Sequence, residues 1–284
     1  MSGSSRRGLF RELAAAAARA IPDDRLPPSA KPARSTPLLS ADELERYSRQ
    51  LVLPEFTELA QIALRDASVL VVGAGALGSP VALYLAGAGV GRLGIADDDD
   101  VEVSNLQRQP LHFTPDLGVA KAESAAAKLR FLNPDIVVEP YRVRIDETNA
   151  AGLVEGQDLV VDCSDSFATR YAVNRACCAA GIDLIEGGAA GWSGLVMTIL
   201  PGRTACYRCA FAAEPAEAPS CAEAGILGPA AGVIGALQAL EALKLLTGAQ
   251  PPLLDGFLSV DLASYATTTV SVRRDLACPD CGSC

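Results

Sequence analysis

Short apolar runs alternate with amphipathic stretches along most of this chain, and the pattern is clearest after residue 68. Residues 69–72 are apolar and mostly β-branched, and the glycine-rich stretch 73–78 (GAGALG) follows them. A run this short that is closed by glycines is typical of a buried parallel strand. The apolar stretch 79–88 predicts a helix ending at Gly89, and residues 94–97 predict a second strand. Together they predict a βαβ unit.

The alternation of strands and helices continues to residue 185, and the chain becomes richer in strands beyond it. Ser40 and Glu43 form a capping-box pattern at the start of the first helix, and Gly181 is typical of a residue that ends a helix. Helices are expected at 40–51, 56–65, 119–132, 167–180 and 231–247, and further strands at 136–143, 159–162, 194–200, 257–262 and 267–273. The predicted fold class is α/β, with a doubly wound, mostly parallel, Rossmann-like sheet and a smaller, strand-rich C-terminal portion.

Residues 1–39 differ from the rest of the chain in composition. Residues 9–21 predict one short amphipathic helix, and five prolines between positions 22 and 37 predict an extended linker. We expect this extension to be disordered and without a catalytic role. Residues 40–284 are expected to form the folded domain.

Charge and composition disfavour several classes of partner. The net charge of −10 disfavours a nucleic-acid backbone or an anionic membrane surface as the main partner. The longest apolar segment, 230–246, carries Gln238, Glu241 and Lys244 and therefore predicts a buried helix rather than a membrane span. The N-terminus lacks the hydrophobic region of a signal peptide. A reducing, cytoplasmic location is therefore expected, in which the nine cysteines bind metal or react.

The glycine-rich stretch has the spacing of a nucleotide-binding turn. Gly73 permits a tight turn, Gly75 lets a phosphate approach the backbone, and Gly78 lets the next helix pack closely. The amides at the start of that helix favour an anion. Asp97 stands where a carboxylate meets a ribose hydroxyl. On this motif alone, a nicotinamide or flavin dinucleotide is the commonest ligand.

Three cations flank this turn in the sequence, namely Arg49, Arg108 and Lys121. Arg108 and Lys121 follow the second strand, so we expect them in the crevice at the carboxyl ends of the strands. Phosphoryl and nucleotidyl transfer use such fixed cations together with a metal, although each cation alone also fits a surface ion pair. Asp165, at the tip of its strand, is expected to hold Mg²⁺ through a hard oxygen or to cap the following helix, or both.

Two CxxC pairs, Cys206/Cys209 and Cys278/Cys281, stand far apart in the sequence. Four thiolates in two such pairs are typical of a tetrahedral structural zinc site. A redox dithiol and two separate disulfides are the alternatives. A redox CxxC belongs at a helix start after a strand, whereas the first pair here follows a Pro-Gly turn and the second lies at the chain end. Zinc is therefore the preferred interpretation.

The remaining thiols and the histidine fall into different classes. Cys221 follows prolines and precedes glycines, so it is a candidate nucleophile on a mobile loop. Cys163, Cys177 and Cys178 lie in apolar settings and are expected in the core. His112 is the only histidine, so a histidine-based triad is not expected and we predict a surface position for it.

Ordered motifs between Arg46 and Cys281 resemble the MoeB/ThiF/HesA family, the bacterial relatives of the ubiquitin-activating enzymes. The matching motifs are, in order, RYSRQ, GAGALG, DDDDVEVSNLQRQ, GVAKAESA, the strand ending in CSD, CYRC, CAEAGILGP with GVIGALQALEALK, and CPDC. Motifs in this order and spacing are far more specific than the glycine turn alone. They favour ATP over a dinucleotide.

The resemblance implies that the protein adenylates the C-terminal glycine of a small ubiquitin-like sulfur-carrier protein ending in Gly-Gly and releases pyrophosphate. It implies ATP, Mg²⁺ and structural Zn²⁺, and a homodimer in which Arg49 reaches the partner subunit's active site. Carried over residue by residue, it assigns Gly73, Gly75 and Gly78 to the nucleotide turn, Asp97 to the ribose, Ser104, Asn105, Arg108 and Lys121 to phosphates, Asp165 to Mg²⁺, and Cys206, Cys209, Cys278 and Cys281 to zinc. Cys221 matches the cysteine with which some members carry the activated carrier or its sulfur.

Three features depart from the family pattern. Ser166 stands where the family usually has Asn, the proline-rich extension has no counterpart in short members, and no rhodanese module follows Cys284. The sulfur is therefore expected from an external donor, a cysteine desulfurase or a rhodanese, and the carrier is expected to serve molybdopterin, thiamine or another thio-product. The alternative function is a scaffold that binds ATP and a carrier without turnover.

Overall fold

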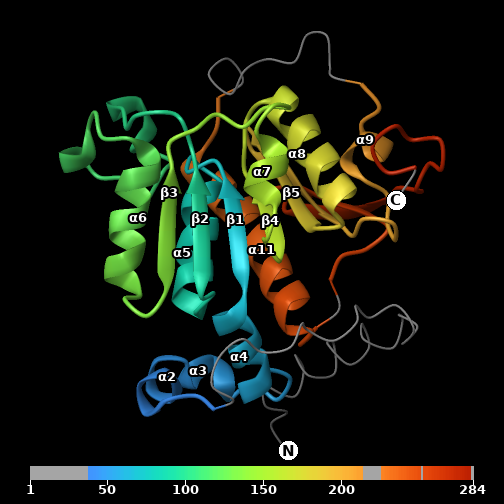
Figure 1. Cartoon of the computed structure of the whole chain (residues 1–284). Helices are drawn as coiled ribbons and strands as arrows, with labels where there is room; N and C mark the ends of the chain where they lie inside the picture. The colour runs from blue at the N-terminus through green and yellow to red at the C-terminus, as the bar shows by residue number, and fades with distance from the viewer. Residues whose placement is uncertain (1–37, 214–224, 251, 283–284) are drawn as a thin grey trace, which may run out of the picture.

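The protein is described by a computed structural model that covers residues 38–213, 225–250 and 252–282. One mixed sheet forms its centre, with the strand order β3-β2-β1-β4-β5-β6-β7-β8. The strands are β1 (Ser68–Val72), β2 (Arg92–Ala96), β3 (Val137–Tyr141), β4 (Leu159–Asp162), β5 (Asp183–Ala190), β6 (Ser193–Ile199), β7 (Gly256–Asp261) and β8 (Ala266–Ser271). Neighbours from β3 through β5 are parallel, and β6, β7 and β8 add antiparallel pairs at one edge. The predicted α/β class is therefore correct (Figure 1).

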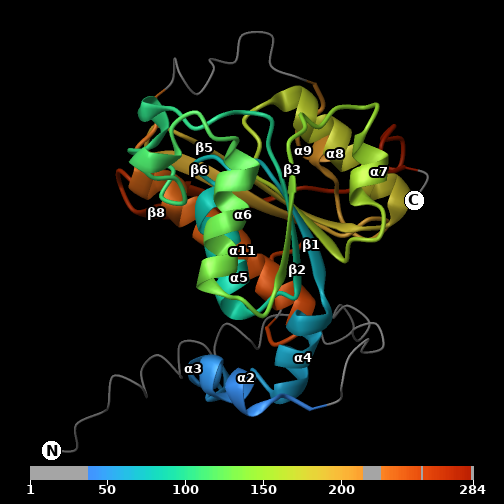
Figure 2. The same ribbon diagram turned by 60° about the vertical axis from the view of Figure 1, so that its left-hand side comes forward.

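Helices cover both faces of the sheet, as Figure 2 shows. The helices are α2 (Ala41–Arg46), α3 (Ser48–Leu51), α4 (Glu58–Asp66), α5 (Gly78–Ala88), α6 (Lys121–Leu132), α7 (Ala150–Val154), α8 (Phe167–Ala180), α9 (Tyr207–Ala210) and α11 (Gly228–Thr247). Helices α4, α5, α6 and α11 share one apolar core with the sheet, and α7, α8 and α9 share the other. Fully buried residues such as Leu70 and Ile95 each stabilise the fold by about 1.5–3 kcal/mol.

Local signals in the sequence account for many element ends. Ser40 and Glu43 form the predicted capping box, in which the Ser40 hydroxyl accepts from the Glu43 amide at 3.2 Å. Gly89 and Gly181 end α5 and α8 in the left-handed conformation, with φ of 90° and 68°, which glycine adopts without steric cost. Strand β5 and helices α7 and α9 were not predicted from the sequence. The apolar pattern of β5 is short because Glu186 and two glycines follow its apolar start.

Helix α11 is long and apolar enough by composition to cross a membrane. In the structure it packs against α4, α5, β5 and β6, and its Gln238 and Glu241 are buried. Gln238 Nε2 donates to the carbonyl oxygen of Asp162 at 2.7 Å, and Glu241 accepts from Thr198 at 3.1 Å. The helix is therefore part of the core, as its polar residues predicted.

The two ends of the parallel strands have different surroundings. Helices α2, α3 and α4 lie beyond the amino end of β1, whereas the turn between β1 and α5 lies beyond its carboxyl end (Figure 1). The candidate nucleotide site is at the carboxyl end, where open α/β sheets bind ligands. The N-terminal residues 1–37, including the predicted helix at 9–21, lie outside the described residues.

Candidate functional site: a nucleotide crevice and a cysteine cluster

The glycine turn between β1 and α5 is shaped by two close backbone approaches. Gly73 has φ of +89°, and a Cβ there would lie 3.0 Å from the carbonyl oxygen of Cys163. A Cβ on Gly78 would lie 1.8 Å from the carbonyl oxygen of Gly73. At Gly75, by contrast, the nearest atom would be Gln109 Nε2 at 3.6 Å, an ordinary contact. The fold itself requires Gly73 and Gly78, and Gly75 leaves room above the turn for a ligand.

Asp97 connects the end of β2 to this turn. Its Oδ2 accepts from the amide of Ala74 at 2.7 Å, and its Oδ1 accepts from the amide of Asp99 at 2.9 Å. Burial raises the pKa of the Asp97 carboxyl, while the charge of Lys121 and the two amides act in the opposite direction. The carboxylate is thus fixed beside the glycine turn, and each oxygen keeps a further lone pair for a ligand.

Lys121 begins α6, and its side chain is only 7 % exposed. Its Nζ lies 2.7 Å from Oδ2 of Asp99, whose own side chain is 66 % exposed. Carboxylate oxygens of Asp97, Asp98 and Asp99 lie within 4.8 Å of one another, so Lys121 is a buried cation beside an acidic group. A buried ammonium whose partner is exposed is available to an incoming anion, because Asp99 exchanges its ion pair for water at little cost.

The loop after β2 carries the remaining predicted phosphate ligands. Ser104 and Asn105 lie in a 3₁₀ turn, η2 (Val103–Asn105), with Ser104 exposed and Asn105 buried. Asn105 Oδ1 accepts from the amide of Glu102 at 3.1 Å, and Arg108 Nη1 donates to the carbonyl oxygen of Ser104 at 2.6 Å. Gly228, at the start of α11, packs against this loop, since a Cβ there would lie 3.2 Å from the Arg108 Cα.

Gln109 is a residue of this loop that the sequence analysis did not single out. It is buried, its amide lies beside Gly75, and its Oε1 has no hydrogen-bond partner among the described residues. A buried amide oxygen without a partner costs free energy unless water or a ligand satisfies it. Its position suits a polar ligand that lies over the glycine turn.

Asp165 lies in the turn between β4 and α8, and it is exposed. The predicted alternative role as the helix cap was wrong: Ser166 is the N-cap, and its hydroxyl accepts from the Thr169 amide at 3.4 Å. Ser166 therefore has a structural function in place of the family's usual Asn. Within the described part of the chain, Asp165 forms no ion pair, so its carboxylate is free to bind a cation.

A buried ionic network lies beneath the turn that carries Asp165, and sequence reasoning missed it. Asp162 and Glu186 are register neighbours on β4 and β5, and both are fully buried. Arg170 of α8 donates from Nη1 to Glu186 Oε2 at 2.9 Å and from Nη2 to the carbonyl oxygen of Ser164. Asp162 Oδ1 accepts from the amide of Ser164 at 2.8 Å. The network therefore fixes both backbone groups of the residue that precedes Asp165.

The two carboxyls of this network share the charge of one arginine. Burial and the neighbouring Asp162 raise the pKa of Glu186 far above its usual range, and the Arg170 charge lowers it in part. The raised pKa favours the neutral form of the Glu186 carboxyl. Glu186, a charged residue after the apolar start of β5, was not recognised in the sequence as part of such a network.

Arg49 is not part of the crevice of its own chain. It is exposed and lies in α3, beyond the opposite end of the strands (Figure 1). Cys221 falls in residues 214–224, which lie outside the described residues. The glycine turn, Asp97 and Lys121 do come together, with Gln109 of the following loop beside Gly75. Cys163 and Ser164, which precede Asp165, lie beside Gly73.

His112 was predicted at the surface, and this prediction was wrong. Its ring is buried, with Nε2 2.8 Å from the carbonyl oxygen of Ala74 and Nδ1 2.9 Å from Ser124 Oγ. Burial lowers the pKa of His112 below its ordinary value, and the Lys128 and Lys121 charges act in the same direction. Both ring nitrogens find polar partners inside the fold, which a lone histidine in a sequence does not reveal.

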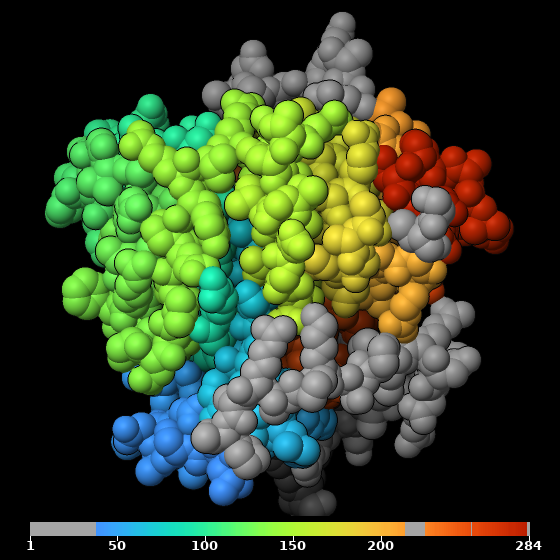
Figure 3. All heavy atoms as spheres, in the orientation of Figure 1, coloured from blue at the N-terminus to red at the C-terminus, as the bar shows by residue number. Residues whose placement is uncertain are grey.

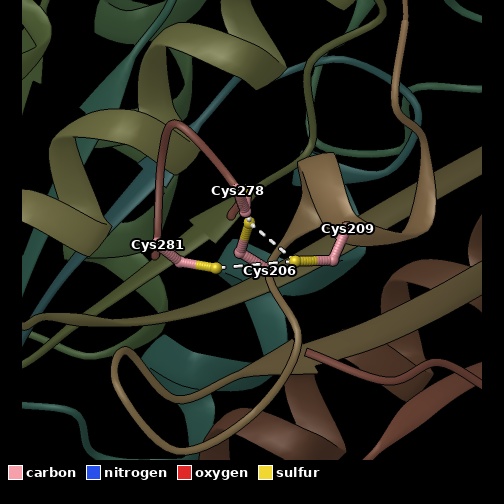
Figure 4. Close-up of side chains that lie close together, drawn as sticks. All are labelled: Cys206, Cys209, Cys278 and Cys281. Carbon is pink, nitrogen blue, oxygen red and sulfur yellow. Dashed lines mark hydrogen bonds between the residues drawn. The ribbon is translucent and has the colours of Figure 1, made fainter. Parts of the chain in front are cut away.

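The four cysteines of the two CxxC pairs form one cluster beside α8 and α9. The sulfur of Cys206 lies 3.8 Å from that of Cys209 and 3.6 Å from that of Cys278, and Cys209 lies 3.5 Å from Cys281. Figure 4 shows the four sulfurs pointing toward one another. A tetrahedral Zn²⁺ with Zn–S bonds of about 2.3 Å separates its sulfurs by about 3.8 Å. The cluster thus has the size of a zinc site, and the two disulfides considered as an alternative are not formed.

Asp280, the residue that precedes Cys281, anchors the cluster to α8. The buried carboxylate of Asp280 accepts from Asn174 Nδ2 at 3.0 Å, Arg175 Nε at 3.2 Å and Arg208 Nε at 2.8 Å. Asn174 Oδ1 in turn accepts from the Tyr207 amide at 2.9 Å. In Figure 3 the C-terminal segment, in red, lies against the yellow surface of α8. These hydrogen bonds around the cluster hold both cysteine pairs against α8. Cys163, Cys177 and Cys178 are buried in the core, as predicted.

Comparison with known proteins identifies one matching family and several similar proteins. The ThiF family profile matches residues 47–281. The chain is 46 % identical over 246 residues to the SAMP-activating enzyme E1 of Haloferax volcanii, covering 86 % of this chain and 91 % of that protein. It is 46 % identical over 248 residues to the sulfur carrier protein adenylyltransferase of Thermus thermophilus, covering 85 % and 92 %. The crystal structure of E. coli MccB with ATP matches with a TM-score of 0.74 at 26 % identity, over 84 % of this chain and 74 % of MccB. This chain therefore belongs to the ThiF family, as its ordered motifs predicted.

Proposed function

We propose that this protein uses ATP to adenylate the C-terminal glycine of a small ubiquitin-like sulfur-carrier protein, which prepares the carrier for thiocarboxylate formation. The observation that carries the proposal is the meeting of the glycine turn, Asp97 and the buried Lys121 at the carboxyl end of the sheet. A relative that is 46 % identical is named sulfur carrier protein adenylyltransferase, which supports the substrate class.

The crevice suits the phosphates of ATP. The open space at Gly75 and the free amides at the start of α5 favour phosphate oxygens. In the proposed complex Asp97 accepts from ribose hydroxyls, while Ser104, Asn105, Arg108 and Lys121 hold the phosphates. The Gln109 amide, whose Oε1 is unpaired, is available as a further polar contact to the nucleotide.

In the proposed reaction, a carboxylate oxygen of the carrier's terminal glycine attacks the α-phosphorus of ATP. The bond from the α-phosphorus to the bridging oxygen breaks, and pyrophosphate leaves with that electron pair. Lys121 and Arg108 are fixed cations that stabilise the charge developing on the phosphates. A bound Mg²⁺ would neutralise phosphate charge, and Asp165 offers an exposed hard oxygen for it.

We assign the cysteine cluster to one structural zinc ion held by Cys206, Cys209, Cys278 and Cys281. The sulfur separations of 3.5–3.8 Å suit a closed tetrahedral set. With four protein ligands such a site keeps no open position for a substrate, so its role is to hold the C-terminal segment on α8. The nearby Asp280 network supports this role.

We further propose a homodimer in which Arg49 completes the partner's site. Arg49 is exposed and lies in α3, at the end of the strands opposite the crevice of its own chain. Its side chain is therefore accessible to a second subunit. Exposed apolar residues lie near it, including Val52 (71 % exposed) and Leu59 (75 % exposed). An interface would bury these side chains and repay the cost of association.

Sulfur transfer is assigned to partners outside this chain, with a cysteine desulfurase or a rhodanese as the donor, in the cytoplasm. Adenylation itself needs no thiol, because the carrier carboxylate is the nucleophile. We therefore assign Cys221 to the later step, in which a thiolate displaces AMP from the acyl adenylate to give a thioester or a related sulfur-linked intermediate.

The proposal is tested by calorimetry and by a pyrophosphate-release assay with a purified Gly-Gly-ending carrier. We expect tighter binding of MgATP than of NAD, and pyrophosphate release only when the carrier is present. A non-catalytic scaffold would bind ATP and carrier without releasing pyrophosphate. Tighter binding of NAD than of ATP would overturn the nucleotide assignment.

A further inference from the structure

His112 connects the nucleotide turn to the helix that carries Lys121. Its Nε2 lies 2.8 Å from the carbonyl oxygen of Ala74, the second residue of the glycine turn, and its Nδ1 lies 2.9 Å from Ser124 Oγ in α6. The amide of the same Ala74 donates to Asp97 at 2.7 Å. The two polar backbone groups of Ala74 are therefore held by two side chains, those of Asp97 and His112.

The partners of the ring determine where its proton lies. A backbone carbonyl only accepts hydrogen bonds, so Nε2 must carry a hydrogen and donate it to Ala74. Ser124 Oγ has a hydrogen of its own to give to Nδ1, and it accepts from Lys128 Nζ at 2.8 Å. The geometry thus suits a neutral ring with the proton on Nε2 and the lone pair of Nδ1 facing Ser124.

The charged groups around the ring also favour its neutral form. Lys128 and Lys121, both on α6, lower the pKa of His112 together with burial. Asp116, on the 3₁₀ turn η3 (Thr114–Asp116), acts in the opposite direction, but it is already paired with Lys128. A positive charge on the ring would therefore lie in a buried site beside two lysines.

We propose that His112 is a positioning residue for the nucleotide turn, as a neutral imidazole whose Nε2 proton fixes the Ala74 carbonyl. The glycine turn then keeps one conformation while the nucleotide binds. This role rests on the proposed ATP site, although the protonation state of the ring does not. Ser79 Oγ lies 3.5 Å from the same carbonyl oxygen, too long to replace the histidine.

Three variants test the role through MgATP binding. His112→Phe keeps an aromatic ring but removes the donor, and we expect the Kd for MgATP to rise about tenfold, because the buried Ala74 acceptor loses its strong partner. His112→Gln retains an N–H donor and is expected to recover most of the affinity. The matched control Ser124→Ala leaves the Ala74 bond in place, so its Kd is expected to stay within about twofold of the wild type.

A steady-state measurement separates positioning from general damage to the fold. With a carrier as co-substrate, His112→Phe should raise the KM for ATP by about the same factor as the Kd and leave kcat nearly unchanged. Thermal melting of each variant without nucleotide serves as the folding check. If His112→Phe does not fold, the Kd values of His112→Gln and Ser124→Ala for MgATP are compared instead. A Kd for His112→Gln that is tenfold higher than that for Ser124→Ala would refute the role of the Nε2 donor.

The protonation state is read independently by ¹⁵N NMR of the imidazole in tag-free protein, where the single histidine gives one pair of ring signals. We expect a protonated Nε2 and an unprotonated Nδ1 at pH 7, with or without MgATP. A proton on Nδ1 at pH 7, or an unchanged Kd in folded His112→Phe, would overturn the proposal. If the wild type binds no MgATP, the proposed function fails and the positioning role with it, whereas the NMR result identifies the tautomer in either case.

Discussion

The nucleotide crevice and the cysteine cluster lie on the same sheet but are built in opposite ways. In the crevice, polar groups are left available: Gln109 Oε1 has no partner among the described residues, Asp165 is exposed, and the ion-pair partner of Lys121 is an exposed carboxylate. In the cluster, the four sulfurs face one another, and Asp280 accepts from three side chains. The first region leaves polar groups open to a ligand, whereas the groups of the second region face one another and are fixed by their neighbours.

Helix α8 connects the two regions. Its first turn follows Asp165, its Arg170 reaches the buried carboxyls under the crevice, and its Asn174 reaches Asp280. A change at the closed region should therefore act on stability first, and a change at the open region should act on the reaction first. The predictions below test this division, beginning with the largest expected effect.

Removal of metal from the cysteine cluster should have the largest effect on stability. We expect one zinc per chain, and we expect chelation or Cys278→Ser to lower the free energy of unfolding by several kcal/mol, because metal binding to a folded site is folding free energy. Elemental analysis of protein purified without chelators and thermal melting provide the measurements. MgATP affinity should fall only under conditions where the protein has begun to melt, and protein without zinc would refute the assignment.

Breaking the buried network should rank second. Arg170→Met leaves the Asp162–Glu186 pair without its cation, and we expect a loss of about 3–5 kcal/mol in the free energy of unfolding. The matched control is Arg142→Met, whose ion pair with Asp100 is exposed at the surface and should contribute less than about 1 kcal/mol. Denaturant titration compares the two variants, and equal losses would contradict the network.

At the open region, Lys121→Ala should leave the fold intact and reduce adenylate formation by about 10²–10³-fold, because it removes a fixed cation where charge develops. Lys244→Ala is the control, since Lys244 forms a comparable ion pair with Glu241 on α11, where we assign no role in the reaction. A melting temperature that falls in proportion to activity would mean that Lys121 is structural.

Mixing two inactive chains tests the partner role of Arg49. An Arg49→Ala chain and a Lys121→Ala chain should regain activity together, because a mixed dimer forms one site with both cations intact. The expected recovery is about one quarter of the wild-type activity if subunits exchange at random and half of the dimers are mixed, each with one intact site of two. Mixed dimers that form but stay inactive would contradict the proposal.

The smallest effect concerns the dependence of stability on pH. Burial and two lysines lower the pKa of His112 below 6.5, so the unfolded chain binds a proton that the folded chain does not. The contribution of His112 to the free energy of unfolding is fully present above pH 6.5. It is lost as the pH falls toward the pKa of His112 in the folded protein, by at most about 1.4 kcal/mol per pH unit. Unfolding of the wild type and of His112→Gln should therefore diverge below pH 6.5, and parallel curves would show that the ring does not titrate as described.

The sequence was a good guide wherever a local pattern determines the structure. The glycine turn, the Ser40 capping box and the ends of α5 and α8 follow from the preferences of single residues or short motifs. The two CxxC pairs were predicted to meet, because a shared metal requires it, and their sulfurs do lie together.

Polar residues inside the fold were the main failure. His112 has partners that only the folded chain supplies, and Gln109 is buried although its Oε1 has no partner among the described residues. Glu186 interrupts the apolar pattern of β5 and pairs with Arg170 of α8. No periodicity in the sequence marks such partners. The cap of α8 was missed by one residue, because Asp165 and Ser166 are both good capping residues and only the backbone conformation decides between them.

The most direct test of the central claim is mass spectrometry of a Gly-Gly-ending carrier after incubation with this protein, MgATP and no sulfur donor. The account predicts a carrier acyl adenylate, formed with one pyrophosphate per carrier. The matched control is the same carrier with its C-terminal carboxylate converted to an amide, which lacks the nucleophilic oxygen and should give neither product. Adenylation of the amidated carrier, or binding of MgATP and carrier without any adenylate, would contradict the account.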